Sequence, residues 1–359
     1  MGIKDIINIF IKAEDSIKIA MAAIDRGARG IALIVDDEQR LLGTVTDGDV
    51  RRAILRGVSL EEPVKAIMNS HYTFVSPDYS RTFITTIFQT RGIMQIPVLD
   101  DEMRVVDIIF YHDFFDDTAK ENWAIIMAGG LGTRLHPLTQ EVPKPMLRVG
   151  AKPIIETIID QLKSYGYMNI VLCLNYKADI IRNYFQDGTN FGVNIKYVSE
   201  RKRLGTAGAL KLAREYISKP FFVLNGDILT KLNFEQFMQF HVNNGNSITI
   251  GTKQYEIQIP YGVVDLKDEK VVNLKEKPCS SYFISGGMYC LDPETIDRIP
   301  EDEYFDITQL ISEYLDAGRK VGSFPITEYW MDIGQIDDYN QAKADYEVMF
   351  RSENSATGE

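Results

Sequence analysis

The feature that most constrains the fold of this 359-residue chain is a short apolar run, 124–128, with a glycine-rich segment directly behind it. Such a run is typical of a buried parallel strand, and the loop after it lies at the carboxyl edge of the sheet, where α/β proteins bind ligands. Glycine lets backbone N–H groups approach phosphate oxygens, and Arg134 and Lys144 add the positive charge that polyphosphate needs. The segment contains Gly129, Gly130, Gly132 and Thr133. The pattern therefore predicts a phosphate-handling loop.

Two familiar glycine-rich motifs do not account for this loop. A P-loop requires Lys followed by Ser or Thr at its end, and the dinucleotide fingerprint requires a different glycine spacing and an acidic residue about twenty positions on. A cluster of turn glycines beside a surface Arg and Lys is the simpler alternative. That alternative would explain the glycines but not the whole set of residues.

From Gly129 through Pro153 the sequence resembles the signature of sugar-1-phosphate nucleotidylyltransferases. The resemblance implies an α/β fold with a Rossmann-like, mostly parallel mixed sheet over 123–350, and the alternating strands and helices agree with it. We expect strands at 170–174, 194–199 and 221–227, helices at 153–166, 180–185, 307–315 and 337–350, and a disordered tail at 351–359. The implied nucleotide-binding residues are Ala128, Gly129, Gly130, Gly132, Thr133, Gly205 and Thr206.

In the reaction that this resemblance implies, a sugar-1-phosphate oxygen attacks the α-phosphate of a nucleoside triphosphate, and pyrophosphate leaves. The attacking oxygen is already an anion, so the enzyme must mainly neutralise charge and align the two phosphates. The implied catalytic residues are Arg134 on the pyrophosphate, Lys144 on both phosphate groups, and Lys277 on the sugar phosphate.

Asp227 and Asp332 match the metal-binding positions of the family, which implies Mg²⁺ as cofactor because this ion prefers oxygen ligands. The simpler alternatives are an N-cap for Asp227 and a loop-capping role for Asp332. Asn225, Gly262 and Glu276 resemble the sugar-binding residues of the family, although Asn before Gly is also a plain turn signal.

The base is predicted from Glu200, which follows the expected strand at 194–199. One carboxylate can accept hydrogen bonds from both N1–H and the N2 amino group of guanine, whereas uracil and thymine would set carbonyl oxygens against its charge. Relatives that use those bases resemble this pattern with Gln instead. The alternative is that Glu200 pairs with Arg201, Lys202 or Arg203 in a solvated turn.

The first 118 residues contain an internal repeat, in which 31–38 recurs 64 positions later as 95–102. This part resembles a tandem CBS pair, or Bateman module, with copies at 1–58 and 59–118 and a linker at 119–122. Thr46 and Asp49 match the residues that hold an adenosine ribose in that family, which implies an adenine nucleotide as a possible ligand. In the second copy Phe110 replaces the hydroxyl residue. Helix capping by Asp47 and Asp49 is the alternative role.

Charge and composition argue against two classes of partner, nucleic acids and membranes. The formal net charge of −12 argues against broad nucleic-acid binding, and charged residues throughout 1–24 argue against a signal peptide or membrane span. We therefore expect a cytoplasmic protein, with no membrane or nucleic-acid partner, that forms a homodimer or higher homo-oligomer.

Taken together, the sequence predicts Mg²⁺-dependent transfer of GMP from GTP to a sugar-1-phosphate. Similarity to guanylyltransferases of nonulosonic (legionaminic) acid pathways, which share this domain order, points to glucosamine-1-phosphate. Mannose-1-phosphate and a UTP-, dTTP- or CTP-dependent reaction remain alternatives. A third alternative is an adenine-nucleotide sensor whose transferase half is degenerate. Against it, the five charged residues of the implied site are all present: Arg134, Lys144, Asp227, Lys277 and Asp332.

Overall fold

The computed structural model describes residues 6–27, 30–91, 93–111 and 119–350, and the chain separates into two compact units, 1–118 and 119–359. Each unit is described by itself. The tail at 351–359 and Asp113, the last acidic residue of the second repeat, lie outside the described residues.

The N-terminal unit contains two small sheets that follow the sequence repeat. The first has the strand order β1-β2-β3 and the second pairs β4 with β5. Its elements are β1 (Phe10–Ile11), α2 (Ile17–Gly27), β2 (Ile31–Val35), β3 (Leu41–Thr46), α3 (Asp47–Leu55), η1 (Val64–Ala66), α4 (Arg81–Arg91), β4 (Gln95–Leu99) and β5 (Val105–Phe110). One hydrophobic cluster combines β2 and β3 with β4 and β5, so the two copies share a core.

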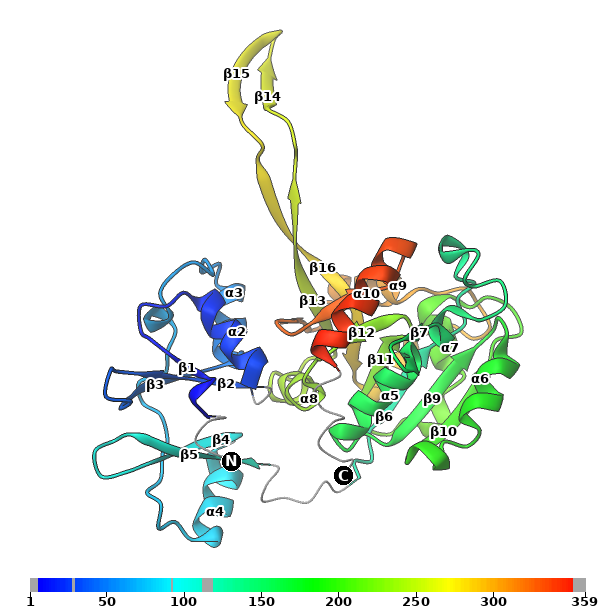
Figure 1. Ribbon diagram of the computed structural model, residues 1–359. Coiled ribbons are helices and arrows are strands. Elements are labelled where there is room, and N and C mark those ends of the chain that lie inside the picture. Colours follow the sequence, from blue (N-terminus) through cyan, green and yellow to red (C-terminus); the bar gives the residue numbers. More distant parts are fainter. Residues whose placement is uncertain (1–5, 28–29, 92, 112–118, 351–359) are drawn as a thin grey trace. The chain divides into compact units, whose positions relative to one another are not determined.

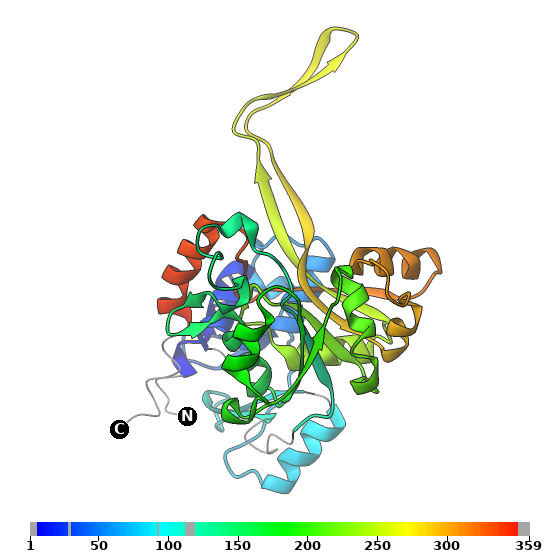
Figure 2. The same ribbon diagram turned by 90° about the vertical axis from the view of Figure 1, so that its right-hand side faces the viewer.

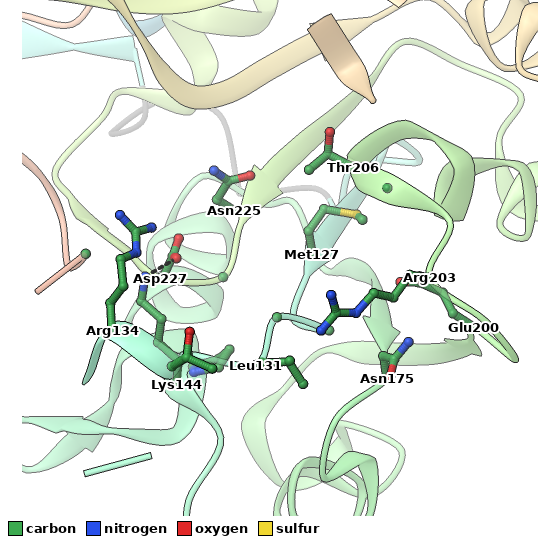
Figure 3. A pocket seen from close by; sticks show the side chains of 18 of the residues that line it. Met127, Leu131, Arg134, Lys144, Asn175, Glu200, Arg203, Thr206, Asn225 and Asp227 are labelled. Atoms are coloured by element: carbon green, nitrogen blue, oxygen red, sulfur yellow. Dashed lines mark hydrogen bonds and ion pairs between the residues drawn. The ribbon is translucent and has the colours of Figure 1, made fainter. Parts of the chain in front are cut away.

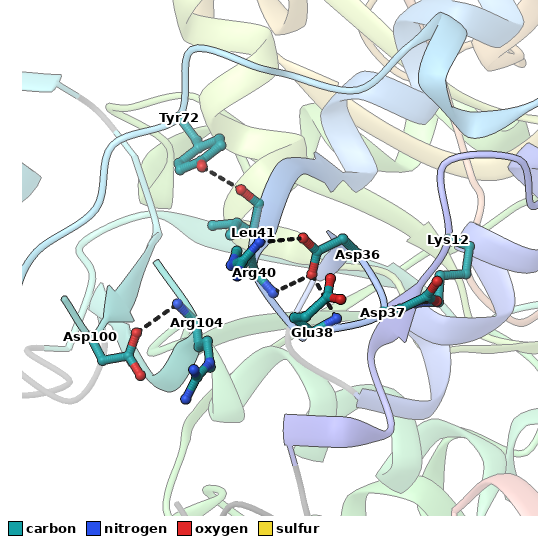
Figure 4. Close-up of polar contacts among 9 residues, drawn as sticks. All are labelled: Lys12, Asp36, Asp37, Glu38, Arg40, Leu41, Tyr72, Asp100 and Arg104. Carbon is teal, nitrogen blue, oxygen red and sulfur yellow. Dashed lines mark hydrogen bonds and ion pairs between the residues drawn. The ribbon is translucent and has the colours of Figure 1, made fainter. Parts of the chain in front are cut away.

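The repeat is visible in matching turns (Figure 4). Asp36 Oδ1 accepts hydrogen bonds from the N–H groups of Glu38 and Arg40, at 2.9 and 2.8 Å, and Asp100 Oδ1 accepts the equivalent pair at 3.0 and 2.8 Å. Gln39 and Met103 adopt the same left-handed conformation, with φ of 63° and 62°. The Leu41 N–H donates to the Met103 carbonyl at 3.0 Å, which joins the two turns.

The C-terminal unit is built on a seven-stranded sheet with the order β10-β9-β6-β11-β16-β13-β17 (Figure 1). Only β16 runs antiparallel to its neighbours, so the predicted mixed, mostly parallel sheet is confirmed. Its strands are β6 (Trp123–Met127), β9 (Asn169–Leu174), β10 (Asn194–Ser199), β11 (Phe221–Asn225), β13 (Ile248–Gln258), β16 (Cys279–Leu291) and β17 (Val321–Pro325).

Helices cover both faces of this sheet, because side chains alternate between faces along each strand. In β6, Ala124 and Ile126 join one hydrophobic cluster and Ile125 joins the other. The helices are α5 (Ile154–Ser164), α6 (Ala178–Phe185), α7 (Gly205–Lys211), α8 (Phe234–Asn243), α9 (Ile307–Asp316) and α10 (Ile336–Met349). Short strands pair as β7 (Arg148–Val149) with β8 (Lys152–Pro153) and β12 (Ile228–Thr230) with β18 (Trp330–Asp332).

A long two-stranded arm leaves the carboxyl edge of the sheet. Beyond this edge β13 and β16 stay paired as far as Gln258 and Cys279, and the chain between them forms an outer hairpin, β14 (Val263–Lys267) and β15 (Lys270–Lys275). Figures 1 and 2 show the arm pointing away from the sheet in both views. No helix within the described residues has the length and apolar character needed to cross a membrane.

Candidate active site

A cavity of about 540 Å³ lies where the parallel strands β6, β9, β10 and β11 end (Figure 3). Parallel strands deliver the residues after them to one edge of the sheet, so segments far apart in sequence meet there. The predicted residues that line this cavity are Gly129, Gly130, Gly132, Thr133, Arg134, Lys144, Glu200, Gly205, Thr206, Asn225 and Asp227. Ala128 lies just before the loop, is buried, and donates its N–H to the Cys173 carbonyl at 2.9 Å.

The glycine-rich loop is tightly fitted at two of its positions. Gly132 has a φ of 64°, and a Cβ there would lie 3.0 Å from the Thr139 side chain and 3.1 Å from Lys144. The Thr139 hydroxyl donates to the Gly132 carbonyl at 2.8 Å, which fixes the turn. A Cβ on Gly129 would lie 3.2 Å from the Glu200 Oε1 atom. The loop therefore needs glycine for its conformation at one position and for close approach at the other.

A buried lysine, Lys144, and Asp227 line one side of the cavity, and Asp332 lies next to this pair. Lys144 Nζ pairs with Asp227 Oδ2 and lies 3.9 Å from Asp332 Oδ1. Strand pairing of β12 with β18 places Ile228 opposite Asp332, so both aspartates stand at this edge. Burial, and then the charge of Asp227, raises the pKa of Asp332, while Lys144 and Arg134 act in the opposite direction.

This set of oxygen atoms is chemically suited to Mg²⁺. Asp227 Oδ1 is buried and has no hydrogen-bond partner among the described residues, so one carboxylate oxygen is left for a ligand. The described residues contain no cluster of three or more protein ligands of the kind that would hold a metal alone. Mg²⁺ commonly takes only one or two carboxylates and completes its shell with water and substrate phosphates. A strand, β12, follows Asp227, which excludes the alternative of a helix N-cap.

Glu200 lies on the other side of the cavity, near Asn175 and Arg203 (Figure 3). Its Oε2 atom accepts a hydrogen bond from the Leu204 N–H at 2.9 Å. Burial raises the pKa of Glu200, opposed by the hydrogen bonds from Leu204 and Asn175 and by the Arg203 charge. Glu200 is therefore a half-buried acceptor at the cavity wall, and the solvated turn considered above does not describe it.

The predicted nucleotide-binding residues Gly205 and Thr206 lie in the first turn of α7, which starts at Gly205. Asp306 holds this helix start: its Oδ1 atom accepts hydrogen bonds from the Thr206 N–H at 2.9 Å and the Thr206 hydroxyl at 3.1 Å. Asp306 also caps α9, and its capping box includes Gln309. A Cβ on Gly205 would lie 2.7 Å from the Phe305 carbonyl oxygen, which explains the glycine.

Among the predicted site residues of this unit, Ala128 and Asp332 lie beside the cavity without lining it, and three others lie outside it on the arm. Gly262, Glu276 and Lys277 lie on the arm, between the paired stem and the outer hairpin, and they are exposed. The physical reason is that the stem is one unbroken ladder from the pair Thr252 and Ser285 to its end, which carries these residues away from the sheet. Gly262 and Glu276 face one another, since a Cβ on Gly262 would lie 3.2 Å from Glu276 Oε2.

Thr46 and Asp49, the predicted ligand residues of the N-terminal unit, are hydrogen-bonded to one another. Asp49 Oδ2 accepts hydrogen bonds from the Thr46 N–H at 2.9 Å and its hydroxyl at 2.7 Å, and Arg52 donates to Asp49 Oδ1 at 2.6 Å. Thr46 is the N-cap of α3, with Asp49 completing a capping box. The capping alternative is therefore present, with Thr46 rather than Asp47 as the cap.

Several cavity residues were missed in the sequence, and two of them directly follow strand ends. Asn175 comes directly after β9 and Gly226 directly after β11, so the rule that ligands bind beyond the carboxyl ends of strands could have found both. Leu131 belongs to the predicted glycine-rich loop. Tertiary packing brings in others, among them Arg203, Tyr304, Asp306 and Gly334.

The model of nucleotidyl transferases matches residues 123–348. The chain belongs to this family. The CBS domain model matches 3–56 and 64–118, so a tandem CBS pair precedes the nucleotidyl transferase unit.

Two curated relatives and one solved structure are similar to this chain. Probable mannose-1-phosphate guanylyltransferase 1 of Oryza sativa subsp. japonica is 38% identical over 60% of this chain and 62% of its own length. UTP–glucose-1-phosphate uridylyltransferase of Synechocystis is 36% identical over 61% of this chain and 62% of its own length. The chain thus spans less than two thirds of the length of these relatives. The crystal structure of HddC from Yersinia pseudotuberculosis is 29% identical, covers 63% of this chain and 99% of its own, and has a TM-score of 0.50.

Proposed function

We propose that the nucleotidyl transferase unit transfers GMP from GTP to a sugar-1-phosphate and releases pyrophosphate. The observation that carries this proposal is the Lys144–Asp227 pair beside the glycine-rich loop, with Asp227 Oδ1 buried and unpartnered among the described residues. A site that must bring two phosphate groups together needs fixed positive charge and a metal-binding oxygen at one place.

Different residues of the chain would bind the triphosphate, neutralise its charge and hold the metal ion. Backbone N–H groups of the loop 129–133 would bind the triphosphate, and Arg134 would stabilise the charge that develops on the leaving pyrophosphate. Lys144 would neutralise the α-phosphate as the sugar-phosphate oxygen forms its new bond there. Asp227 and Asp332 are the residues that would hold Mg²⁺, which would shield the phosphates from one another and keep them in line.

Glu200 supports guanine as the base. A carboxylate has room for about four hydrogen bonds, and the contacts from Leu204 and Asn175 leave acceptor capacity for the N1–H and N2 amino group. Several relatives are named mannose-1-phosphate guanylyltransferases, and a structure of HddC is complexed with GMP-PN. The uridylyltransferase relative keeps UTP as the second candidate.

For the sugar we propose glucosamine-1-phosphate, on the resemblance in domain order to guanylyltransferases of nonulosonic (legionaminic) acid pathways. Mannose-1-phosphate is the second candidate, because the names of several relatives include it. The two differ by the substituent and its orientation at one ring carbon, and the described residues near the cavity provide only Asn225 among the three predicted sugar contacts.

The experiment is a matrix of GTP, ATP, UTP and dTTP against glucosamine-, mannose- and glucose-1-phosphate, with pyrophosphate release as the signal. We expect the largest kcat/KM for GTP with glucosamine-1-phosphate. A preference for UTP or dTTP would overturn the assignment of the base, and a preference for mannose-1-phosphate would overturn the assignment of the sugar. No pyrophosphate from any pair would overturn the proposed activity.

For the CBS pair we propose weak adenine-nucleotide binding at the first copy, through Thr46 and Asp49, with an effect on activity or assembly. A ribose hydroxyl would have to compete with the bonds that Asp49 already accepts, which is why we expect weak binding. A ligand regulates only if it binds two states unequally. Calorimetry with AMP, ADP, ATP and adenosylmethionine tests this, and no heat with any of them would contradict it.

A further inference from the structure

The arm, defined here as residues 252–285, has an apolar face that nothing in its own unit covers. In the outer hairpin Val264 pairs with Leu274 and Leu266 with Val271, so these four side chains share one face. They are 45, 64, 68 and 64% exposed. On the opposite face Asn273 donates to Asp265 at 3.0 Å. A two-stranded hairpin with one apolar face is at best marginally stable until that face is buried.

The charge of the arm favours a second copy of this chain as the cover. Its lysines and carboxylates balance: Lys253, Lys267, Lys270, Lys275 and Lys277 against Glu256, Asp265, Asp268, Glu269 and Glu276. The whole chain has a net charge of −12, which tends to keep copies apart everywhere except at a neutral segment such as this. A basic or acidic partner would require an arm with the opposite net charge.

The cavity, for its part, lacks surplus positive charge. Arg134, Lys144 and Arg203 are matched by Glu200, Asp227 and Asp306 among its lining residues. A triphosphate and a sugar phosphate bring several negative charges into this balanced site. Glu276 and Lys277 have no ion-pair partner within the described residues, and the stem that carries them extends about 20 Å beyond the sheet.

We propose that the arm of one copy lies over the cavity of a second copy and brings Lys277 and Glu276 to its sugar-phosphate side. This inference rests on the proposed function, because it assigns the two residues to that site. The unbroken stem keeps them from their own cavity. Docking on a second copy would bury the apolar face and set the Lys277 ammonium group at the phosphates, with the Glu276 carboxylate left to accept hydrogen bonds from the sugar hydroxyls.

Subunit complementation tests the proposal. A chain with Lys277→Ala and a chain with Asp227→Asn, carrying different affinity tags, are co-expressed, and complexes that hold both tags are isolated. Each variant alone should have little activity. The mixed dimer should have about half of the wild-type rate, because one of its two sites combines an intact cavity with an intact arm. Lys270→Ala, at the tip of the arm, is the matched control and should keep wild-type activity.

A third substitution, Leu266→Asp, shows which of the two chains supplies the working arm. Leu266→Asp on the Asp227→Asn chain should abolish the recovered activity, because that chain supplies the working arm. The same substitution on the Lys277→Ala chain should leave most of it. Mixed dimers no more active than the separate variants, with an active wild type, would overturn the exchange of arms, as would full activity of Lys277→Ala alone. An inactive wild type would overturn the proposed function and this inference with it.

Discussion

Two carboxylates of this chain, Asp49 and Asp227, both follow the end of a strand, and they differ in what their oxygens hold. Asp49 accepts three hydrogen bonds from Thr46 and Arg52, so its capacity is used inside its own helix start. Asp227 gives one oxygen to Lys144 and leaves the other buried without a partner among the described residues. The comparison indicates that an acidic residue after a strand predicts strong ligand binding only where the surrounding fold leaves an oxygen unused, and weak binding where, as at Asp49, the oxygens already have partners.

The largest effect should come from Asp227→Asn. The substitution keeps the shape but removes the charge that would hold Mg²⁺, so kcat should fall by about 100-fold or more with little change in the melting temperature. Steady-state rates at saturating Mg²⁺ and thermal unfolding measure the two quantities. Asp297→Asn, at an exposed carboxylate that pairs with Arg214, is the control and should be active. Wild-type turnover in Asp227→Asn would show that Asp227, like Asp49, is not a metal-binding residue.

Glu200→Gln should change selectivity more than rate. An amide cannot accept two hydrogen bonds from guanine on one charged edge, so the preference for GTP over UTP should shrink by roughly 10- to 100-fold, equivalent to about 1–3 kcal/mol. The ratio of kcat/KM for the two triphosphates is the measurement. An unchanged ratio would show that Glu200 does not select the base.

Acid pH should weaken GTP binding in the wild type. Burial raises the pKa of Glu200 above its ordinary range, so the carboxylate is charged above that pKa and becomes neutral as the pH falls through it. KM for GTP should therefore rise from neutral to acid pH, with an inflection that Glu200→Gln lacks. A profile that is identical in both proteins would assign the inflection to another group.

The glycine-rich loop offers a matched pair of smaller effects. Gly132→Ala places a side chain at a φ of 64° and against Thr139, which should lower the free energy of unfolding by about 1–2 kcal/mol. Gly130→Ala is the control for stability, because nothing lies within 4 Å of its added Cβ. Thermal unfolding distinguishes the two, and equal melting temperatures would contradict the tight turn at Gly132.

The smallest effect should be that of Asp49→Ala, which removes the capping box of α3. We expect a loss of about 1 kcal/mol in the stability of the CBS pair and no change in turnover without adenine nucleotide. Denaturant unfolding of the full chain, followed by hydrogen exchange at α3, measures the first quantity. A loss of turnover comparable to that of Asp227→Asn would place Asp49 in a role other than capping.

Part of this picture follows from the sequence. Buried strands at 124–128 and 221–227 must end at one edge of a parallel sheet, which brings Arg134, Lys144 and Asp227 together without further information. The repeat of 64 positions likewise predicts the paired turns at Asp36 and Asp100.

Other parts depend on packing that a sequence pattern does not encode. The contact of Asp306 with Thr206 joins residues from different segments, and only the fold shows that one carboxylate can cap α9 and also bind the first turn of α7. The course of the arm is a second case, because no motif in 252–285 indicates whether the hairpin returns to the sheet. The family resemblance implied Glu276 and Lys277 at the sugar-phosphate site, and the structure places both on the arm.

The central claim is that the cavity catalyses nucleotidyl transfer from GTP, and tracing the phosphates tests it most directly. GTP labelled at the α-phosphate and GTP labelled at the γ-phosphate are incubated in parallel with sugar-1-phosphate and Mg²⁺, using wild type and Asp227→Asn. We predict that the α-label enters a nucleotide-sugar and the γ-label enters pyrophosphate, in wild type only. Transfer of the γ-label to the sugar, or its release as inorganic phosphate, would contradict the account.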